Sequence, residues 1–194
     1  MGFVSVLSFA HQLISQRAQA GDIVIDATMG NGVDTLYLAK LVGKRGHVYG
    51  FDIQPEALSN TEMRLRSDSQ DEAAVEHVQL HLMSHAQMEH VIAERHFEKV
   101  AAVTFNLGYL PGADPGTITR QESTIPALES ALRLLRKGGI VTIVLYSGHD
   151  GGQQETDAVE SWASQLPLAS YQVLRYQIAN QSKQAPYLLA VEKR

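Results

Sequence analysis

The chain has 194 residues, of which 44% are hydrophobic and 19% are charged, as in an ordinary soluble globular domain. It contains no cysteine, which excludes a disulfide framework, a zinc–thiolate site and a thiol nucleophile. Lysine and arginine number 16 against 21 aspartate and glutamate, and the net charge of −5 excludes a broad, charge-driven nucleic-acid surface while allowing a small basic patch.

Strand-like and helix-like patterns alternate along the chain. The first 20 residues lack a basic start followed by a long apolar run, so they predict an amphipathic helix rather than a signal peptide. Apolar, β-branched runs predict strands over residues 23–25, 47–51, 75–82, 100–105, 140–146, 171–178 and 187–191. Helical spacing, with Pro or Gly near several ends, predicts helices over residues 33–42, 55–66, 86–96, 124–136 and 156–165.

This order predicts an α/β fold in one domain spanning residues 1–194. Five β–α repeats, followed by two strands with no helix between them, indicate a doubly wound, mostly parallel seven-stranded sheet with a C-terminal antiparallel hairpin. In such sheets ligands bind beyond the carboxyl ends of the strands. No segment reaches the ~20 apolar residues that cross a bilayer, so we expect a cytoplasmic protein with no membrane partner.

A glycine turn follows the first predicted strand. The chain reads DATMGNGVD from Asp26 to Asp34, and Gly30 and Gly32 allow a tight turn that a ligand can approach closely. Asp52 follows the second strand, 20 residues after Gly32, where a carboxylate can accept hydrogen bonds from both hydroxyls of a ribose. Together these residues predict a site for an adenosine-containing cofactor.

Two cofactor classes compete for this site. A dinucleotide fingerprint needs a third glycine where this chain has Thr35, and Asp26 and Asp34 flank the turn with negative charge that would repel a pyrophosphate. S-adenosylmethionine has no phosphate, and its ammonium group suits an acidic site. The pattern therefore favours S-adenosylmethionine, with a nicotinamide-dependent oxidoreductase as the alternative from another enzyme class.

Four motifs, together with Asp52 and the terminal hairpin, carry a family resemblance. They are DATMGNGVDT (26–35), NLGYLP (106–111), YSGHDGG (146–152) and APYLLAVEK (185–193). They resemble class I S-adenosylmethionine-dependent methyltransferases, which have a Rossmann-like fold, and more closely the small bacterial family labelled putative rRNA methylase. The resemblance covers nearly the whole chain. It implies methylation of the 5-aminomethyl group of tRNA wobble uridine 34, with the tRNA anticodon stem-loop as partner and S-adenosylhomocysteine as the cofactor product.

The segment after the fourth strand is the expected acceptor site. Asn106-Leu107-Gly108-Tyr109 lies where amino-methyltransferases carry Asn/Asp-Pro-Pro-Tyr/Phe, with Leu-Gly in place of Pro-Pro. The Asn106 side-chain oxygen and the Leu107 carbonyl can accept the N–H groups of an amine and direct its lone pair. Tyr109 can stack on a flat base.

The methylated atom is expected to be nitrogen or oxygen. Methylation at C5 of a pyrimidine usually needs a cysteine that adds to the ring, and this chain has none. An amine must first lose a proton, and spacing leaves the acceptor open among His149, Asp150, Asp114 and Asp34. His11 and most other histidines are expected to serve structure or solvent, and because no two of them lie at ligand spacing beside an acid, we expect no metal.

The remaining candidates lie beside these motifs. The cofactor site is expected to comprise Asp26, Thr28, Gly30, Asn31, Gly32, Asp34, Thr35, Asp52, Gln54, Ser84, His85 and Asn106. The substrate site is expected to comprise Tyr109, Arg120, Tyr146, His149 and Lys183. The catalytic groups are expected to be Asn106, Leu107, Tyr109 and His149.

Three further interpretations stay open at this point. They are a methyltransferase for another RNA site or a small amine, the oxidoreductase, and a non-catalytic S-adenosylmethionine-binding protein, which the intact Asn106 and Tyr109 oppose. DNA is not an expected partner. A homodimer is the expected alternative to a monomer, because one compact domain offers little surface for RNA.

Overall fold

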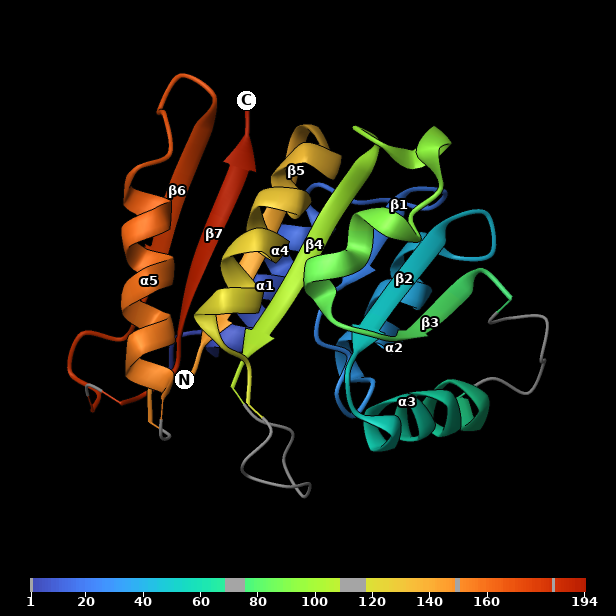
Figure 1. The fold of residues 1–194 in the computed structure, drawn as a ribbon, viewed down its shortest axis with the longest axis horizontal. Coiled ribbons are helices and arrows are strands. Elements are labelled where there is room, and N and C mark those ends of the chain that lie inside the picture. The colour runs from blue at the N-terminus through green and yellow to red at the C-terminus, as the bar shows by residue number, and fades with distance from the viewer. Residues whose placement is uncertain (1, 69–75, 109–117, 149–150, 183) are drawn as a thin grey trace.

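One twisted sheet forms the centre of the molecule (Figure 1). The computed structural model describes residues 2–68, 76–108, 118–148, 151–182 and 184–194. In this part of the chain seven strands run in the order β3-β2-β1-β4-β5-β7-β6. They are β1 (Ile23–Asp26), β2 (His47–Asp52), β3 (Val78–Leu82), β4 (Val100–Leu107), β5 (Leu135–Leu145), β6 (Tyr171–Tyr176) and β7 (Tyr187–Lys193). Strands β1 to β5 pair in parallel and β7 is antiparallel to β5 and β6, which confirms the predicted fold class.

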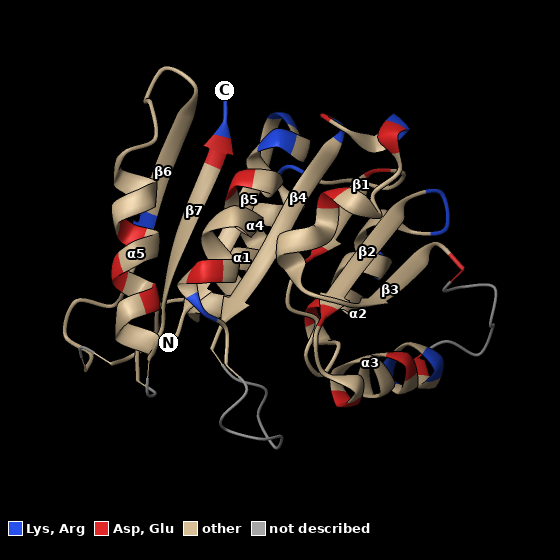
Figure 2. Cartoon of the chain, viewed as in Figure 1, with Lys and Arg blue, Asp and Glu red and all other residues tan. Residues whose placement is uncertain are grey.

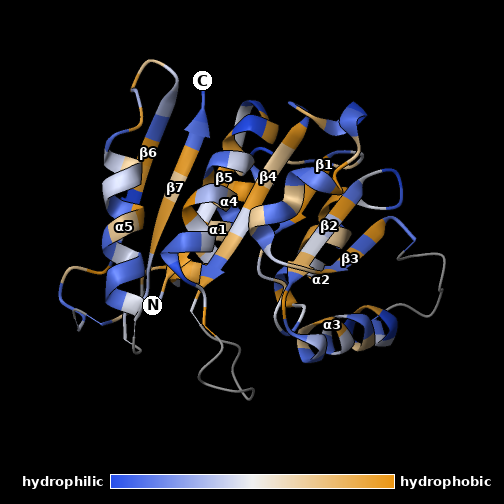
Figure 3. Ribbon diagram, in the orientation of Figure 1, coloured by the Kyte–Doolittle hydropathy of each residue, from blue (hydrophilic) through white to orange (hydrophobic). Residues whose placement is uncertain are grey.

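Helices cover both faces of the sheet. They are α1 (Val6–Ser15), α2 (Val33–Val42), α3 (Pro55–Asp68), α4 (Gln121–Leu134) and α5 (Gly152–Ser164), with short 3-10 helices η2 (His85–His90) and η3 (Glu94–His96). One buried cluster joins α4, α5 and η2 to one face, and a second joins α1, α2 and α3 to the other. Figure 3 shows hydrophobic residues along β4 and β7 and hydrophilic residues on the outer faces of α3 and α5, as expected of two amphipathic layers around a buried sheet. Among the described helices, none combines the length and the apolar character needed to cross a membrane.

Several element boundaries differ from the sequence prediction. The helix predicted over residues 86–96 is instead the pair η2 and η3, two short 3-10 helices of the kind that often serve as connectors. The helix predicted over residues 124–136 ends at Leu134, and β5 begins directly at Leu135. Gly138, with φ 73°, therefore lies inside a strand rather than after a helix.

The carboxyl ends of β1, β2 and β4 meet at one edge of the sheet. Asp26 ends β1 in register with Gly50 of β2 and Thr104 of β4. Asp52 ends β2, and Asn106 is the second-last residue of β4. Because the strand order reverses between β1 and β4, this edge is the switch point where such sheets bind ligands.

Candidate active site

A cavity of about 390 Å³ opens beyond the carboxyl ends of β1, β2 and β4. Ten of the residues predicted from the sequence line it, namely Thr28, Gly30, Asn31, Asp34, Asp52, Gln54, Ser84, His85, Asn106 and Tyr146. Two of these are acids, whereas no lysine or arginine of the described residues lines the cavity. The site therefore suits a ligand that carries positive charge and no phosphate.

Two backbone groups hold Asp52 at the cavity. The Gly30 N–H donates to Asp52 Oδ2 at 3.0 Å, and the Gln54 N–H donates to Oδ1 at 3.1 Å. Burial raises the pKa of Asp52, while these hydrogen bonds act to lower it. A carboxylate has about four acceptor sites, so the fixed group keeps capacity for two hydroxyl donors of a ribose.

Asp26 is fully buried and does not line the cavity. Thr35 Oγ1 donates to its Oδ2 at 2.6 Å, and the Thr28 N–H donates to its Oδ1 at 3.2 Å. Burial, and next the charge of Asp34, raise the pKa of Asp26 to about 7. Asp26 and Thr35 thus support the glycine turn on the side away from the cavity. Thr28 Oγ1 connects that turn to β4, since it accepts the Asn106 N–H at 2.7 Å.

Asn106 presents a buried acceptor atom that has no partner within the described part of the chain. Its Nδ2 donates to Asp34 Oδ2 at 2.6 Å, which fixes the orientation of the amide because a carboxylate oxygen can only accept. Its Oδ1 is buried and makes no hydrogen bond to the described residues. An acceptor left unpaired costs about 1–3 kcal/mol, so this atom indicates a ligand with a donor group.

His11 contacts the other oxygen of Asp34. The distance from His11 Nε2 to Asp34 Oδ1 is 2.6 Å. The sequence prediction assigned His11 to structure or solvent, and no motif links α1 to the glycine turn. Only the packing of α1 against the sheet brings this ring beside a cavity residue.

The Leu107 carbonyl, the second predicted amine acceptor, already has a partner. It accepts the Tyr146 N–H at 3.2 Å, because β4 and β5 stay paired up to Leu107 and Leu145. The Leu107 side chain is in the core and does not line the cavity. Tyr146 does line it, and Gly108 lies so close that a Cβ there would be 3.3 Å from Tyr146 Cβ.

Ser84 and His85 line the cavity from the end of β3. Ser84 Oγ accepts the Ala86 N–H at 3.3 Å, and His85 Nδ1 lies 3.1 Å from the Ala27 carbonyl oxygen. Burial lowers the pKa of His85, so the ring is neutral near pH 7. Since its Nδ1–H donates to the carbonyl, Nε2 is left as an acceptor, which suits the amino group of a purine.

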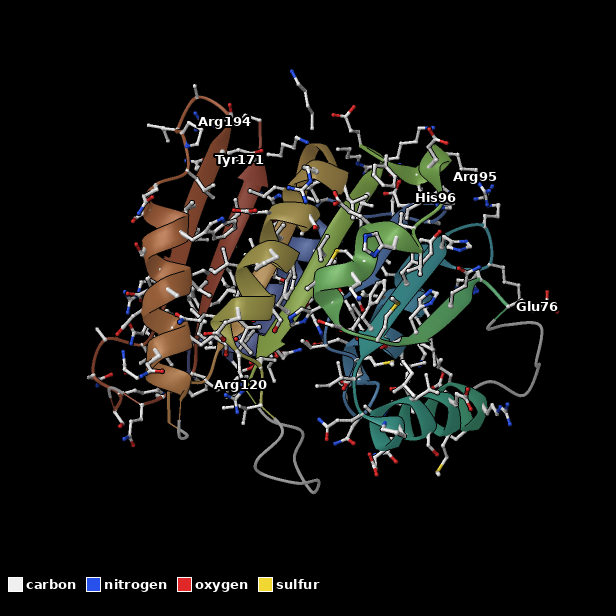
Figure 4. The ribbon with its side chains drawn as sticks, in the orientation of Figure 1. Glu76, Arg95, His96, Arg120, Tyr171 and Arg194 are labelled. Carbon is white, nitrogen blue, oxygen red and sulfur yellow. The ribbon has the colours of Figure 1, made fainter. Side chains whose placement is uncertain are left out.

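Gly32 and Arg120, which were also predicted as site residues, are described but do not line the cavity. Gly32 begins α2 with φ 74° and packs so closely on α3 that a Cβ would be 2.8 Å from Thr61 Cα. Arg120 is exposed just before α4, at the edge of the sheet that holds the cavity (Figure 4). The predicted Tyr109, Asp114, His149, Asp150 and Lys183 lie outside the described residues. No group of three histidine, aspartate or glutamate side chains in the described residues is arranged to hold a metal ion.

Five large apolar side chains that sequence reasoning missed also line the cavity. They are Leu7, Met29, Val33, Ile53 and Ile118. Val33 and Ile53 are each 55% exposed, which is costly for an apolar side chain unless a ligand covers it. Val33 follows the glycine turn and Ile53 follows Asp52, and these positions are the signal that could have identified both residues.

Comparison with known proteins matches this chain to one family. The model of the family described as "Putative rRNA methylase" matches residues 48–192. The tRNA (mnm(5)s(2)U34)-methyltransferase of Arabidopsis thaliana chloroplasts is 39% identical over 190 residues, which are 95% of this chain and 68% of that protein.

Solved structures agree with this match. The crystal structure of a putative rRNA methylase from Clostridium thermocellum has a TM-score of 0.93 and 39% identity, and all of both chains is covered. A putative methyltransferase from Streptococcus mutans, solved in complex with S-adenosylhomocysteine, has a TM-score of 0.87 and 34% identity, again over all of both chains. The acidic lining indicated a cofactor without phosphate, and these matches confirm that the cofactor is S-adenosylmethionine.

Proposed function

Because the chain belongs to the family described as putative rRNA methylases, we propose that it is an S-adenosylmethionine-dependent N-methyltransferase of tRNA. Its substrate is the 5-aminomethyl group of wobble uridine 34, and its product is the methylaminomethyl group. The name of the Arabidopsis thaliana relative supports this substrate. The absence of cysteine agrees, since it closes the covalent route to C5 methylation.

The observation that carries the proposal is the buried Oδ1 of Asn106, which has no hydrogen-bond partner among the residues that the structure describes. A neutral amine carries N–H donors, and donation to this oxygen fixes the direction of its lone pair. Asp34 holds the amide so that Oδ1, rather than Nδ2, is the free atom. Positioning of this kind is the main contribution that the protein can make to an in-line displacement.

The cavity residues divide between cofactor and substrate. Asp52 would bind the ribose hydroxyls, Gly30 would approach the cofactor through its backbone, and Ser84 and His85 would contact the adenine, with Ile53 against its face. When bound, S-adenosylmethionine supplies a methyl group on a sulfonium. The acidic lining stabilises that positive charge without counter-charges from lysine or arginine.

The RNA partner in this proposal is the tRNA anticodon stem-loop. Figure 2 shows most lysine and arginine near the upper edge of the molecule, with acidic residues among them, and few at the lower edge where the cavity opens, which fits a small RNA footprint at the cavity rim. Arg120 is a described cation near that rim, and it would contact a phosphate. Lys183 keeps the same proposed role.

Assembly and location complete the proposal. A homodimer would widen the surface available to RNA, and light scattering of the purified protein tests it. We place the protein in the cytoplasm because its substrate tRNA is matured there.

The experiment that tests the function is deletion of the gene, followed by mass spectrometry of tRNA nucleosides. We expect 5-aminomethyl-uridine or its 2-thio form to accumulate, and the methylated form to return with a wild-type plasmid but not with Asn106→Ala. An unchanged nucleoside profile would refute the substrate. Loss of a different methylated nucleoside would instead support the alternative of another RNA site.

A further inference from the structure

His11, Asp34 and Asn106 form a continuous chain of contacts from solvent to the cavity. His11 Nε2 lies 2.6 Å from Asp34 Oδ1, and Asp34 Oδ2 accepts from Asn106 Nδ2, also at 2.6 Å. The three residues come from α1, α2 and β4. Asp34 lines the cavity beside the free Asn106 Oδ1, so a donor bound to Asn106 also faces Asp34.

The His11 ring is held in place yet reaches solvent. It stacks on Tyr37 with 3.8 Å between ring centroids and 3° between planes. The Tyr37 hydroxyl donates to the His11 carbonyl at 2.8 Å, which locks the two helices together. The His11 side chain remains 26% exposed, against 13% for Asp34. A proton that reaches the imidazole can therefore pass to water.

Among the described titratable side chains near Asp34, His11 is the one placed to exchange a proton with it. Burial, and then the charge of Asp34, raise the pKa values of Tyr37 and Tyr146, so both phenols stay neutral and cannot accept a proton. Asp26 is sealed behind the glycine turn and makes its contacts there. Within the described residues Asp34 pairs with His11 and with no lysine or arginine.

The substrate of the proposed function needs such a pair. An alkylamine like that of lysine has a pKa of about 10.4, so it is almost wholly an ammonium at pH 7 and has no lone pair to donate. We propose, on the basis of that function, that Asp34 accepts the proton of the substrate ammonium and that His11 positions Asp34 and passes the proton to solvent.

Deprotonation of the substrate ammonium precedes the transfer of the methyl group. The ammonium nitrogen loses one proton to the Asp34–His11 pair, and one proton leaves the imidazole for water. The neutral amine then uses its lone pair for the new N–C bond, while the electrons of the broken S–C bond stay on sulfur. The products are S-adenosylhomocysteine and a secondary ammonium.

The test compares His11→Ala with the control His90→Ala, which removes an exposed histidine of η2 away from the cavity. Single-turnover rates are measured from pH 6.5 to 9.5 on tRNA that carries 5-aminomethyl-uridine, and binding of S-adenosylhomocysteine is measured by calorimetry. General-base assistance contributes roughly 10²–10⁴-fold. We expect His11→Ala to be about 100-fold slower at pH 7, with a deficit that shrinks severalfold by pH 9.5 because the amine loses its own proton there. Its affinity for S-adenosylhomocysteine should stay within about twofold, since His11 does not line the cavity.

Two outcomes would overturn the inference. A deficit that is constant with pH would show a structural role, and an unchanged rate at pH 7 would show no role. If His11→Ala does not fold, Asp34→Asn takes its place, because it removes the charge at nearly constant shape. A loss of cofactor affinity with an unchanged rate constant in Asp34→Asn would make Asp34 a cofactor ligand instead. Failure of the wild-type protein to methylate this tRNA would refute the proposed function itself, which separates the two claims.

Discussion

Asn106 owes its free acceptor atom to Asp34. Without the carboxylate, the amide could turn and present Nδ2 to the cavity. The substrate amine would then lose the acceptor that directs its lone pair. We therefore predict that Asn106→Ala lowers the methylation rate constant about 100-fold, the cost of misplacing a reacting group. Affinity for S-adenosylhomocysteine should hardly change, and Asn180→Ala, in an exposed turn, is the control. Rapid-quench kinetics with calorimetry make the comparison, and a fully active Asn106→Ala would remove the acceptor role.

Asp52 governs cofactor affinity in the same account. Replacing it by alanine removes the acceptors for the ribose hydroxyls and frees the Gly30 and Gln54 N–H groups. We expect the Kd for S-adenosylhomocysteine to rise about 10–100-fold, in line with about 1.5–3 kcal/mol for hydrogen bonds to a charged group. Calorimetry measures it, with the exposed Glu56→Ala as control. Equal affinities would rule out the ribose assignment.

Sequence reasoning at this scale succeeded where one motif placed a residue on a strand end. Asp52 and Asn106 were found in this way, since each follows a strand whose carboxyl end reaches the cavity. His11 was missed because its contact with Asp34 depends on how α1 packs. The close contact of Gly32 with Thr61 of α3 could not be seen in a local sequence pattern.

Among the elements, α5 fixes both the start of α4 and the segment after β4. Glu155 is 3% exposed, and its two oxygens accept hydroxyl donors from Thr119 and Thr124, each at 2.6 Å. The Thr119 N–H also donates to the Gly108 carbonyl at 2.9 Å. One buried carboxylate thereby braces the rim of the cavity at Thr119 and Gly108.

Glu155→Ala should destabilise the fold by about 3 kcal/mol, because the buried Thr124 hydroxyl and the half-buried Thr119 hydroxyl lose their acceptor. For a chain of this size that corresponds to roughly 6–12 °C in Tm. Thermal unfolding followed by circular dichroism measures it. The exposed Glu129→Ala on α4 should stay within about 0.5 kcal/mol of wild type. A similar Tm for both variants would contradict the stabilising role of Glu155.

Element order could be predicted because apolar runs and turn residues alternate clearly. The ends of elements could not, since tertiary packing decides them. The fifth helix was predicted to begin at position 156, yet α5 begins at Gly152, where the left-handed Gly151 caps it, and this brings Glu155 into the helix. Likewise, η2 and η3 stand where one helix over residues 86–96 was predicted.

For the molecule as a whole, the buried Asp26 behind the glycine turn makes the free energy of unfolding depend on pH. The folded pKa of Asp26 is about 7, above the ordinary value of 3.8. The folded state therefore keeps a proton that the unfolded state has lost, and stability falls as pH rises between about 4 and 7. The loss from this group is on the order of 4 kcal/mol.

Asp26→Asn should remove most of that slope in the cofactor-free protein. Urea unfolding at several pH values from 4.5 to 8 measures the free energy of unfolding, and the exposed Asp157→Asn serves as control. The wild type and the control should lose stability over this range while Asp26→Asn stays nearly level. Parallel curves for all three proteins would contradict the assignment of the slope to Asp26.

Methylation of the wobble nucleoside by the whole molecule can be measured with purified components. Purified protein and S-adenosylmethionine are incubated with tRNA from the deletion strain, and the wobble nucleoside is analysed by mass spectrometry. The account predicts that 5-aminomethyl-uridine, or its 2-thio form, becomes the methylaminomethyl nucleoside, with one S-adenosylhomocysteine released per methyl group and no conversion by Asn106→Ala. An unchanged wobble nucleoside, from protein that calorimetry shows to bind the cofactor, would contradict it.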